Sequence, residues 1–269
     1  MKVAFLVGLF ILGACLGSFL CCQARRLNIK QKFGKKAKQK LGSRSVCLHC
    51  NTKLKWYDNI PIFSWLFLAG KCRSCHHKIG ILEFLSEIGL ATSFLVIGTT
   101  INPDSATINT WLIFIFTILA TIVLAFLAIY DGAYGELPMQ FLCLAILLGL
   151  AVAFLKQSQV VALSGFSSEI ILNPLGSVAI LGGLYLLLYL ISKGKWVGDG
   201  DWLLGIAIGL ALNSPWLALF ALLISNILAC FIMLPFVIKN KNKQIYFGPF
   251  MVAAFVITIA CSGLFMSLL

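Results

Sequence analysis

Charged side chains are scarce in this sequence: only 11% of its 269 residues are Asp, Glu, Lys or Arg, whereas 60% are hydrophobic. A soluble domain has about 25% charged residues, so this chain lacks the polar groups to cover a water-soluble globule. The same shortage excludes a disordered chain and a coiled coil. Apolar runs of about 20 residues, the length that an α-helix needs to cross a bilayer, recur along the sequence. We therefore predict an all-α, polytopic helical membrane protein.

Eight apolar runs are candidate transmembrane helices. They cover Val3–Cys22, Ile81–Thr99, Thr110–Tyr130, Leu137–Leu155, Pro174–Ile191, Asp201–Leu212, Pro215–Ile238 and Phe247–Leu268. A cleaved signal peptide is an alternative for the first run, because Leu12–Cys15 resembles a lipoprotein cleavage box. A single Lys before a long apolar stretch, with many basic residues after it, favours a retained helix.

Acidic residues are even scarcer than basic ones, at nine against 21. Residues 23–80 alone hold 14 of the basic residues and a single acid, Asp58. If this segment is cytoplasmic, the eight runs place 19 of the 21 Lys and Arg residues on the cytoplasmic side, as the positive-inside rule requires. We therefore expect a multi-pass protein of the inner (plasma) membrane with both termini outside.

The charge pattern also divides the chain into three parts. We expect a first transmembrane helix at 1–22, a basic cytoplasmic domain at 23–80 and a helical membrane domain at 81–269. Anionic lipid headgroups are the expected neighbours of the basic domain, and residues 28–44 should be a solvated, Lys-rich tether. A nucleic-acid-binding module is a rival interpretation of this charge, but we expect no nucleic acid as a partner, because that interpretation leaves the acids of the membrane domain unexplained.

The ten cysteines fall into two classes. Six lie within apolar runs, where a thiol behaves as a small apolar side chain. The other four form two Cys-x-x-Cys pairs, Cys47–Cys50 and Cys72–Cys75, separated by 21 residues. This pattern is typical of a closed, tetrahedral structural zinc site. Disulfides or a redox pair are the alternatives, but a reducing cytoplasm disfavours disulfides, and a redox pair usually occurs once, beside a βαβ pattern that is absent here.

Most of the acids have ordinary interpretations. Asp58, Asp104 and Glu169 fall in predicted loops and should be solvated. Glu83 and Glu87 lie four residues apart at the start of the second run, where acids stabilise a helix amino terminus. A role for these two in a binding cleft has no support in the sequence.

Asp131 and Asp201 are different, because the topology places both at the cytoplasmic boundary. Two carboxylates at one level can share a water and a proton, which is the requirement for aspartyl hydrolysis. Each alone could be a helix-end charge, and Asp199 or Asp201 could be a helix cap. Gly198 and Gly200 favour the catalytic interpretation, since glycine permits unusual φ values and the close approach of a substrate strand. A proton-coupled transporter is the rival interpretation, although it would be expected to carry its acids nearer the bilayer midplane.

Together these residues resemble the type IV prepilin peptidases, a family of Gly-x-Gly-Asp aspartyl proteases. The similarity rests on segments along nearly the whole chain: Gly13–Leu20, Arg44–Cys50, Asp58–Leu66, Gly70–Cys75, Asp131 with Pro138, and Gly198–Asp201. The resemblance implies that Asp131 and Asp201 are the catalytic residues, rather than Asp199.

The resemblance further implies an endopeptidase that removes the short basic leader from type IV prepilin or pseudopilin precursors on the cytoplasmic side. Many members of the family then methylate the new amino terminus with S-adenosylmethionine, and the cysteine-bearing loop is the region that bifunctional members possess. The residues Ile81-Leu82 and Cys21-Cys22 depart from the family pattern beside this loop, so methylation is the less firmly implied activity.

Overall fold

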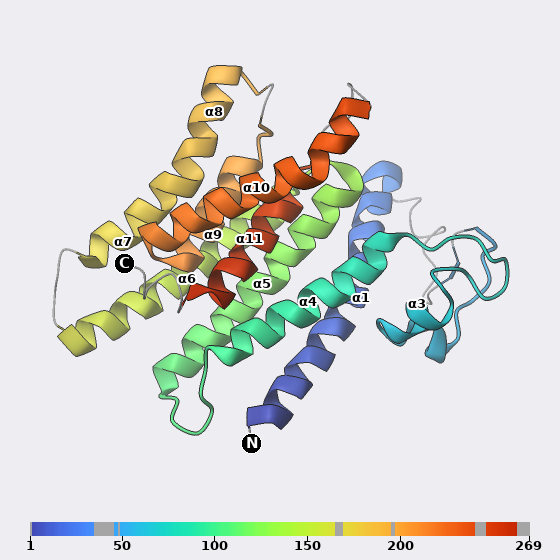
Figure 1. Cartoon of the computed structure of the whole chain (residues 1–269), viewed down its shortest axis with the longest axis horizontal. Coiled ribbons are helices and arrows are strands. Elements are labelled where there is room, and N and C mark those ends of the chain that lie inside the picture. Colours follow the sequence, from blue (N-terminus) through green and yellow to red (C-terminus); the bar gives the residue numbers. More distant parts are fainter. Residues whose placement is uncertain are drawn as a thin grey trace. The chain divides into compact units, whose positions relative to one another are not determined.

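The computed structural model describes residues 2–34, 46–47, 49–164, 169–194, 197–239 and 246–262. Regular structure in these residues is helical apart from two isolated β-bridges, which confirms the all-α membrane fold (Figure 1). The chain forms two compact units. The amino-terminal unit contains Val3–Leu95, and the carboxy-terminal unit contains Val96–Leu269.

Each of the eight predicted apolar runs contains a helix. The helices are α1 (Lys2–Phe33), α4 (Ile81–Thr99), α5 (Ile108–Tyr134), α6 (Met139–Ser164), the consecutive α7 (Glu169–Val178), π-helical η3 (Ala179–Gly183) and α8 (Leu184–Ser192), then α9 (Asp201–Leu212), α10 (Pro215–Lys239) and α11 (Gly248–Ala260). In the part of the chain that the structure describes, six segments are long and apolar enough to cross a membrane.

Two of the predicted spans are shorter than a membrane crossing. The helices α9 and α11 have 12 and 13 residues, which at 1.5 Å per residue is about 18–20 Å against a hydrocarbon core of about 30 Å. The last predicted run continues to Leu268, but residues 263–269 lie outside the described residues.

The helix α1 continues well beyond the first apolar run. It ends at Phe33, because Arg and Lys are good helix formers and allow a helix to continue past the apolar boundary. The expected tether at 28–44 is therefore wrong for residues 28–33, and residues 35–45 lie outside the described part.

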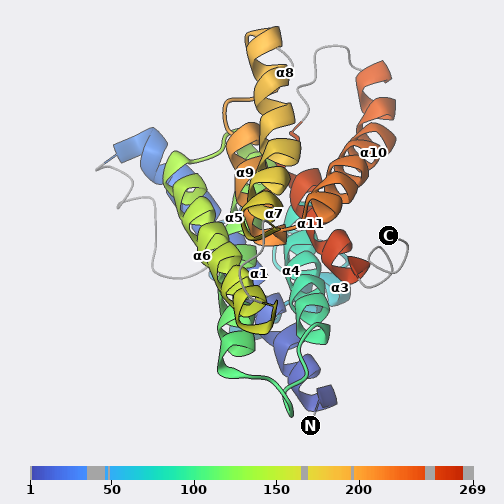
Figure 2. The same cartoon turned by 90° about the vertical axis from the view of Figure 1, so that its left-hand side faces the viewer.

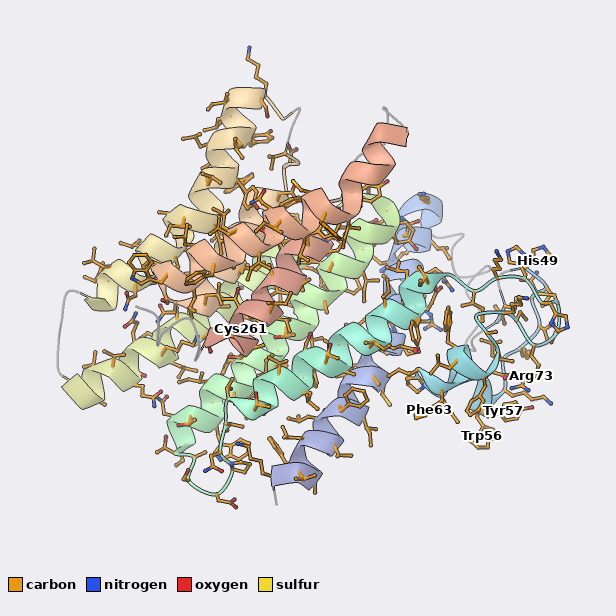
Figure 3. All side chains as sticks on the ribbon, in the orientation of Figure 1. His49, Trp56, Tyr57, Phe63, Arg73 and Cys261 are labelled. Carbon is orange, nitrogen blue, oxygen red and sulfur yellow. The ribbon has the colours of Figure 1, made fainter. Side chains whose placement is uncertain are left out.

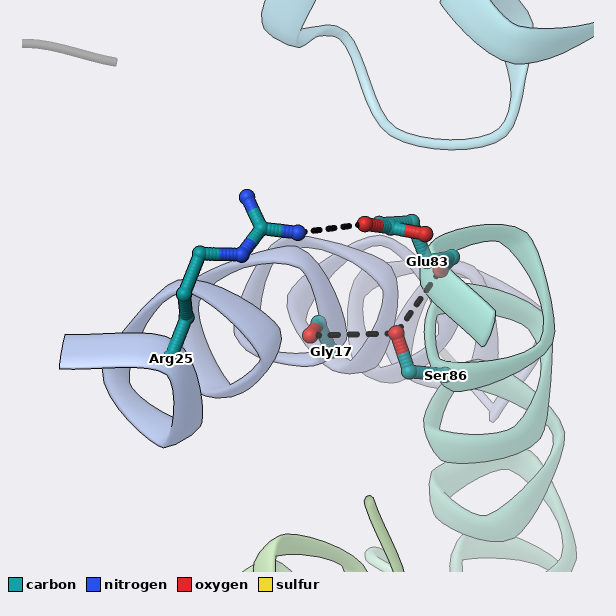
Figure 4. A network of polar contacts seen from close by, with 4 residues as sticks. All are labelled: Gly17, Arg25, Glu83 and Ser86. Atoms are coloured by element: carbon teal, nitrogen blue, oxygen red, sulfur yellow. Dashed lines mark hydrogen bonds and ion pairs between the residues drawn. The ribbon is translucent and has the colours of Figure 1, made fainter. Parts of the chain in front are cut away.

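Glycines bring α1 and α4 together in the amino-terminal unit. A Cβ on Gly13 would lie 2.7 Å from the carbonyl oxygen of Leu90, and one on Gly17 would lie 2.8 Å from Cα of Glu87. Two glycines four residues apart on one helix face allow this close backbone contact, as is common between membrane helices. The hydroxyl of Ser86 adds a hydrogen bond to the carbonyl oxygen of Gly17 (3.4 Å; Figure 4).

The short helix α9 is the centre of the carboxy-terminal unit. It contacts α5, α6, α7, η3, α8, α10 and α11, which surround it in both views (Figures 1 and 2). Close packing depends on Gly205 and Gly209, where a Cβ would lie 2.8 Å from the carbonyl oxygens of Leu181 and Ser177. The helix that carries Asp201 at its first position is therefore held on all sides by other helices.

Candidate metal centre and carboxylate pair

The two Cys-x-x-Cys segments fold into matching turns. In the first, the N–H of Cys47 donates to the carbonyl oxygen of Thr52 (3.0 Å) and the N–H of Asn51 donates to that of Cys47 (2.9 Å). In the second, Cys72 and His76 repeat both bonds, at 2.9 Å each. Asn51 and His76 also share a left-handed backbone, with φ of 55°. Each turn therefore directs its two sulfurs to one side.

The four sulfurs form one cluster. The Sγ atoms of Cys47, Cys50, Cys72 and Cys75 lie within 4.8 Å of one another, and those of Cys47 and Cys75 are 3.8 Å apart. A tetrahedral ion with bonds of about 2.3 Å would hold its sulfur ligands about 3.8 Å apart, so this cluster could hold a metal ion. The imidazole rings of His49 and His77 stack on each other, with 4.2 Å between the ring centres.

Hydrogen bonds favour the thiolate form of two of the ligands. The Thr52 hydroxyl and backbone N–H lower the pKa of Cys50 to about 6. The backbone N–H groups of Cys75 and Ser74 lower the pKa of Cys72. A metal ion binds cysteine as the thiolate, so these donors favour the metal-binding form of Cys50 and Cys72, whereas desolvation and the neighbouring sulfurs raise the pKa of Cys75.

Acids hold this segment together and attach it to its helices. Asp58 was expected to be solvated, and that expectation is wrong: its side chain is only 8% exposed, accepts a bond from Nε of Arg73 at 2.8 Å and also accepts the N–H of Lys55. Glu83 pairs with Arg25 of α1 at 2.6 Å (Figure 4). Glu87 is buried and accepts the backbone N–H of Ile62 at 2.7 Å.

A cavity of about 460 Å³ lies among these groups within the amino-terminal unit. Its walls combine guanidinium groups, carboxylates and an aromatic ring, from Arg25, Arg26, Glu83, Glu87 and Trp65. A volume of this size is in the range of small-molecule sites, about 300–1,000 Å³. Glu83 and Glu87, for which the sequence indicated only a helix-end role, therefore line a cleft.

The carboxylate of Asp131 is buried near the end of α5. Gly135 ends this helix in the left-handed conformation, with φ of 70°, and its N–H donates to the carbonyl oxygen of Asp131. The side-chain Oδ2 accepts the N–H of Gly248 at 2.9 Å. Gly248 is the first residue of α11, so the positive end of that helix dipole faces the carboxylate.

The carboxylate of Asp201 is also buried, at the first position of α9. Its Oδ2 accepts the N–H of Gly198 at 2.9 Å, and its own N–H donates to the carbonyl oxygen of Gly198. The neighbouring Asp199 is exposed and its carboxylate hydrogen-bonds the hydroxyl of Tyr189. Of the two acids in the Gly-x-Gly-Asp segment, Asp201 is therefore the one directed inward.

The fold brings Asp131 and Asp201 together from positions 70 residues apart. Their carboxyl groups lie close enough to interact through their charges. One oxygen of each carboxylate is held by a backbone N–H, that of Gly248 for Asp131 and that of Gly198 for Asp201.

The role expected of Gly198 and Gly200, to admit a substrate strand, stays a prediction. Neither has a positive φ, so unusual backbone angles are not the reason for glycine here. At Gly200 the reason is packing, since a Cβ would lie 2.7 Å from Cβ of Leu137. That leucine lies in the segment between α5 and α6, so Gly200 allows the two aspartate-bearing segments to approach each other.

Two residues of this site were missed by the sequence analysis. Gly248 holds Asp131, and the available signal was the Gly-Pro pair at the start of the last apolar run. Tyr185 is buried on α8, where its hydroxyl lies 3.3 Å from Oγ of Ser225 and its ring packs edge-on against Phe247. The charge of Asp201 acts on this tyrosine. Nothing in the sequence pattern distinguishes Tyr185 from the other tyrosines of the apolar runs.

Comparison with known proteins agrees with these features. Residues 11–101 match the family described as "Bacterial Peptidase A24 N-terminal domain". The chain is 30% identical over 217 residues to the prepilin leader peptidase/N-methyltransferase of Aeromonas hydrophila, covering 78% of this chain and 69% of that protein. The chain belongs to the type IV prepilin peptidase family.

Other relatives carry similar names. The type 4 prepilin-like proteins leader peptide-processing enzyme of Escherichia coli is 28% identical over 222 residues, which cover 82% of this chain and 77% of that protein. A Myxococcus xanthus prepilin leader peptidase/N-methyltransferase is 39% identical over 84 residues, which cover 31% of this chain and 23% of the relative. No solved structure matches the chain. The similarity to the first two relatives extends over most of the chain and so includes both units.

Proposed function

We propose that this protein is a membrane aspartyl endopeptidase that removes the leader peptide from type IV prepilin or pseudopilin precursors. The observation that carries the proposal is the buried pair Asp131 and Asp201, with one oxygen of each fixed by a backbone N–H. Family membership supplies the substrate class, because the relatives are named for prepilin processing. The same names give no support to a proton-coupled transporter.

The proposed chemistry uses the two carboxyl groups in opposite protonation states. One carboxylate takes a proton from a water as that water attacks the scissile carbonyl carbon, and the other carboxyl group donates a proton toward the substrate. Two like charges close together favour such a singly protonated pair. The N–H groups of Gly248 and Gly198 keep the carboxylates oriented during these transfers.

The proposed reaction takes place at the cytoplasmic face of the inner membrane. Asp131 lies at the end of α5 and Asp201 at the start of α9, the ends that the distribution of Lys and Arg assigns to the cytoplasm. The exposed backbone at Gly198 lies beside Asp201 and is the proposed path of the substrate strand.

We further propose zinc as the ion of the four-cysteine cluster, in a structural role. Four thiolate ligands complete a tetrahedral shell and leave no position for a substrate or water. Zinc would then stabilise the folded segment between α1 and α4, which has two short helical turns and little apolar core of its own.

A second activity, methylation of the new amino terminus, is supported by the relatives' names and by the 460 Å³ cavity. S-adenosylmethionine carries a carboxylate, an amine and ribose hydroxyls, and the cavity offers guanidinium groups of Arg25 and Arg26 and carboxylates of Glu83 and Glu87. The volume and the donor and acceptor groups fit this methyl donor. When bound, it would supply the methyl group to the amine.

The proposal is tested with purified protein, synthetic or purified prepilins, and mass spectrometry of the product amino terminus. Asp131→Asn and Asp201→Asn should each lower cleavage by at least about 10³-fold, because a catalytic unit loses its function when one member is removed. Asp199→Asn is the matched control and should cleave normally. When S-adenosylmethionine is added to the protein without substitutions, the mass of the cleaved product should increase by that of one methyl group. Normal cleavage by either Asp131 or Asp201 variant would refute the assignment of the pair.

A further inference from the structure

The segment between the first two membrane helices presents an exposed apolar surface. On α3 (Phe63–Phe67), the side chains of Phe63, Leu66 and Phe67 are 59%, 54% and 85% exposed. They occupy positions i, i+3 and i+4, which form one face of a helix. Trp56, 80% exposed, and Ile60 extend this surface. These five residues are called the aromatic face. In Figure 3, Trp56, Tyr57 and Phe63 lie at one end of the segment and His49 at the other.

The attachment of α3 to α4 fixes its depth. The N–H of Ile62, immediately before α3, donates to Oε2 of Glu87 at 2.7 Å, and the ring of Trp65 stacks on Phe84 at 4.4 Å between ring centres. Phe84 and Glu87 are the fourth and seventh residues of α4. At 1.5 Å per residue, Glu87 lies about 9 Å along the helix from its start.

That depth lies inside the membrane-spanning part of α4. The 19 residues of α4 extend about 28 Å, slightly less than the hydrocarbon core of about 30 Å, so nearly the whole helix is needed to cross it. The partner helix gives the same depth, because Gly17, within the first apolar run, packs against Glu87. The helix α3 therefore lies beside the first two turns of a transmembrane helix, rather than out in the aqueous phase.

The backbone conformation of Ile62 indicates that contacts with α4 hold α3 in this position. Ile62 has a φ of 65°, a conformation that is costly for a β-branched residue and persists only where surrounding contacts hold it. Those contacts are the hydrogen bond to Glu87 and the stacking of Trp65, both to α4.

We propose that the aromatic face inserts into the headgroup–acyl boundary of an anionic phospholipid bilayer. At this depth the surroundings of an exposed apolar surface are lipid, and aromatic rings prefer the boundary region. Ile81 and Leu85 on the first two turns of α4 are also exposed apolar side chains. Lys55, an exposed basic residue of the same segment, complements anionic headgroups. The inference concerns a lipid contact and does not depend on the proposed peptidase activity.

Photo-crosslinking tests this inference in the full-length protein. A photoreactive benzoyl-phenylalanine replaces Phe67, and the protein is reconstituted in vesicles of phosphatidylethanolamine and phosphatidylglycerol. The matched control carries the same group at Ser74, an exposed position in the second cysteine turn. We expect severalfold more lipid adduct, measured by mass spectrometry, from position 67 than from position 74.

The outcomes separate the competing occupants. Equal lipid adducts at the two positions, or adducts from position 67 to residues 96–269 or to an added prepilin, would overturn the lipid contact. The same substitution at Phe63 gives a second, independent measurement if the first variant does not accumulate. Prepilin cleavage is measured in the same samples, so loss of the lipid adduct with normal cleavage contradicts this inference alone.

Discussion

Each carboxylate of the proposed catalytic pair depends on one backbone N–H from a glycine. For Asp131 this donor is Gly248, 117 residues away in sequence, and a Cβ on Gly248 would lie 2.8 Å from Oδ2 of Asp131. An alanine at this position must push the carboxylate or the start of α11 aside. Displacing a catalytic group by about 1 Å costs on the order of 10²-fold in rate.

We therefore predict that Gly248→Ala lowers the rate of prepilin cleavage by about 10- to 100-fold, while the protein still accumulates in the membrane. Initial rates at saturating substrate measure the change. The matched control is Gly89→Ala, since a Cβ on Gly89 would meet no atom within 4 Å. Equal rates in the two variants would show that the Gly248 contact does not orient Asp131.

At the scale of whole helices, α9 has its carboxy-terminal end fixed by α6. The amine Nζ of Lys156 donates to the carbonyl oxygens of Ala211 and Leu212 at 2.8 and 3.2 Å, and Gln157 donates to Asn213. The last carbonyls of a helix have no partner within it, and a cation there also complements the helix dipole. Lys156 thus anchors the far end of the short helix that begins with Asp201.

Replacing this lysine tests the anchor. We predict that Lys156→Met destabilises the protein by about 1–3 kcal/mol, because polar carbonyls lose their donor away from water. Thermal unfolding in detergent should show a lower Tm, and Lys156→Arg should retain part of the lost stability because it keeps a cationic donor. Lys2→Met, which removes an exposed lysine, is the control. A Tm for Lys156→Met equal to that of the control would contradict the anchor.

The helices were largely predictable from the sequence, whereas the contacts between them were not. Apolar runs fixed α4 and α9 at the residues predicted, because polar or glycine residues flank both. The same pattern could not show that α1 continues to Phe33. An apolar run indicates which part of a helix lies in the membrane, but not the residue at which the helix ends. The bond from Gly248 to Asp131 and that from Ile62 to Glu87 join residues distant in sequence, and a single sequence does not encode such pairs in any periodicity.

In the whole molecule, the two proposed sites belong to different compact units. The cysteine cluster lies within Val3–Leu95, and both aspartates lie within Val96–Leu269. The carboxy-terminal unit has its own buried core around α9, which contains no residue of the cysteine segment. Loss of the metal should therefore unfold residues 46–80 and leave the helices that carry the aspartates folded.

The ionisation of the ligands determines the pH at which the metal is lost. Hydrogen bonds with the Thr52 hydroxyl and N–H lower the pKa of Cys50 to about 6, so the thiolate form of this ligand is favoured at neutral pH. As pH falls through about 6, a proton competes with the ion for Cys50, and metal affinity should decrease. Above that pH the affinity should depend less on the Cys50 proton.

We predict one equivalent of zinc in the purified protein, with release that increases as the pH is lowered from 7.5 to 5.5, a range that includes the Cys50 pKa of about 6. Competition with a chromophoric chelator measures the affinity at each pH.

Limited proteolysis with mass spectrometry should then show new cleavage sites within 46–80 and none within α5, α6 and α9. Cys72→Ser should lower the zinc content and give the same proteolytic pattern at neutral pH, whereas Cys143→Ser, outside the cluster, should not. Full zinc retention by Cys72→Ser would exclude the four-thiolate site, and proteolysis spreading into α9 would show that the second unit depends on the metal for its fold.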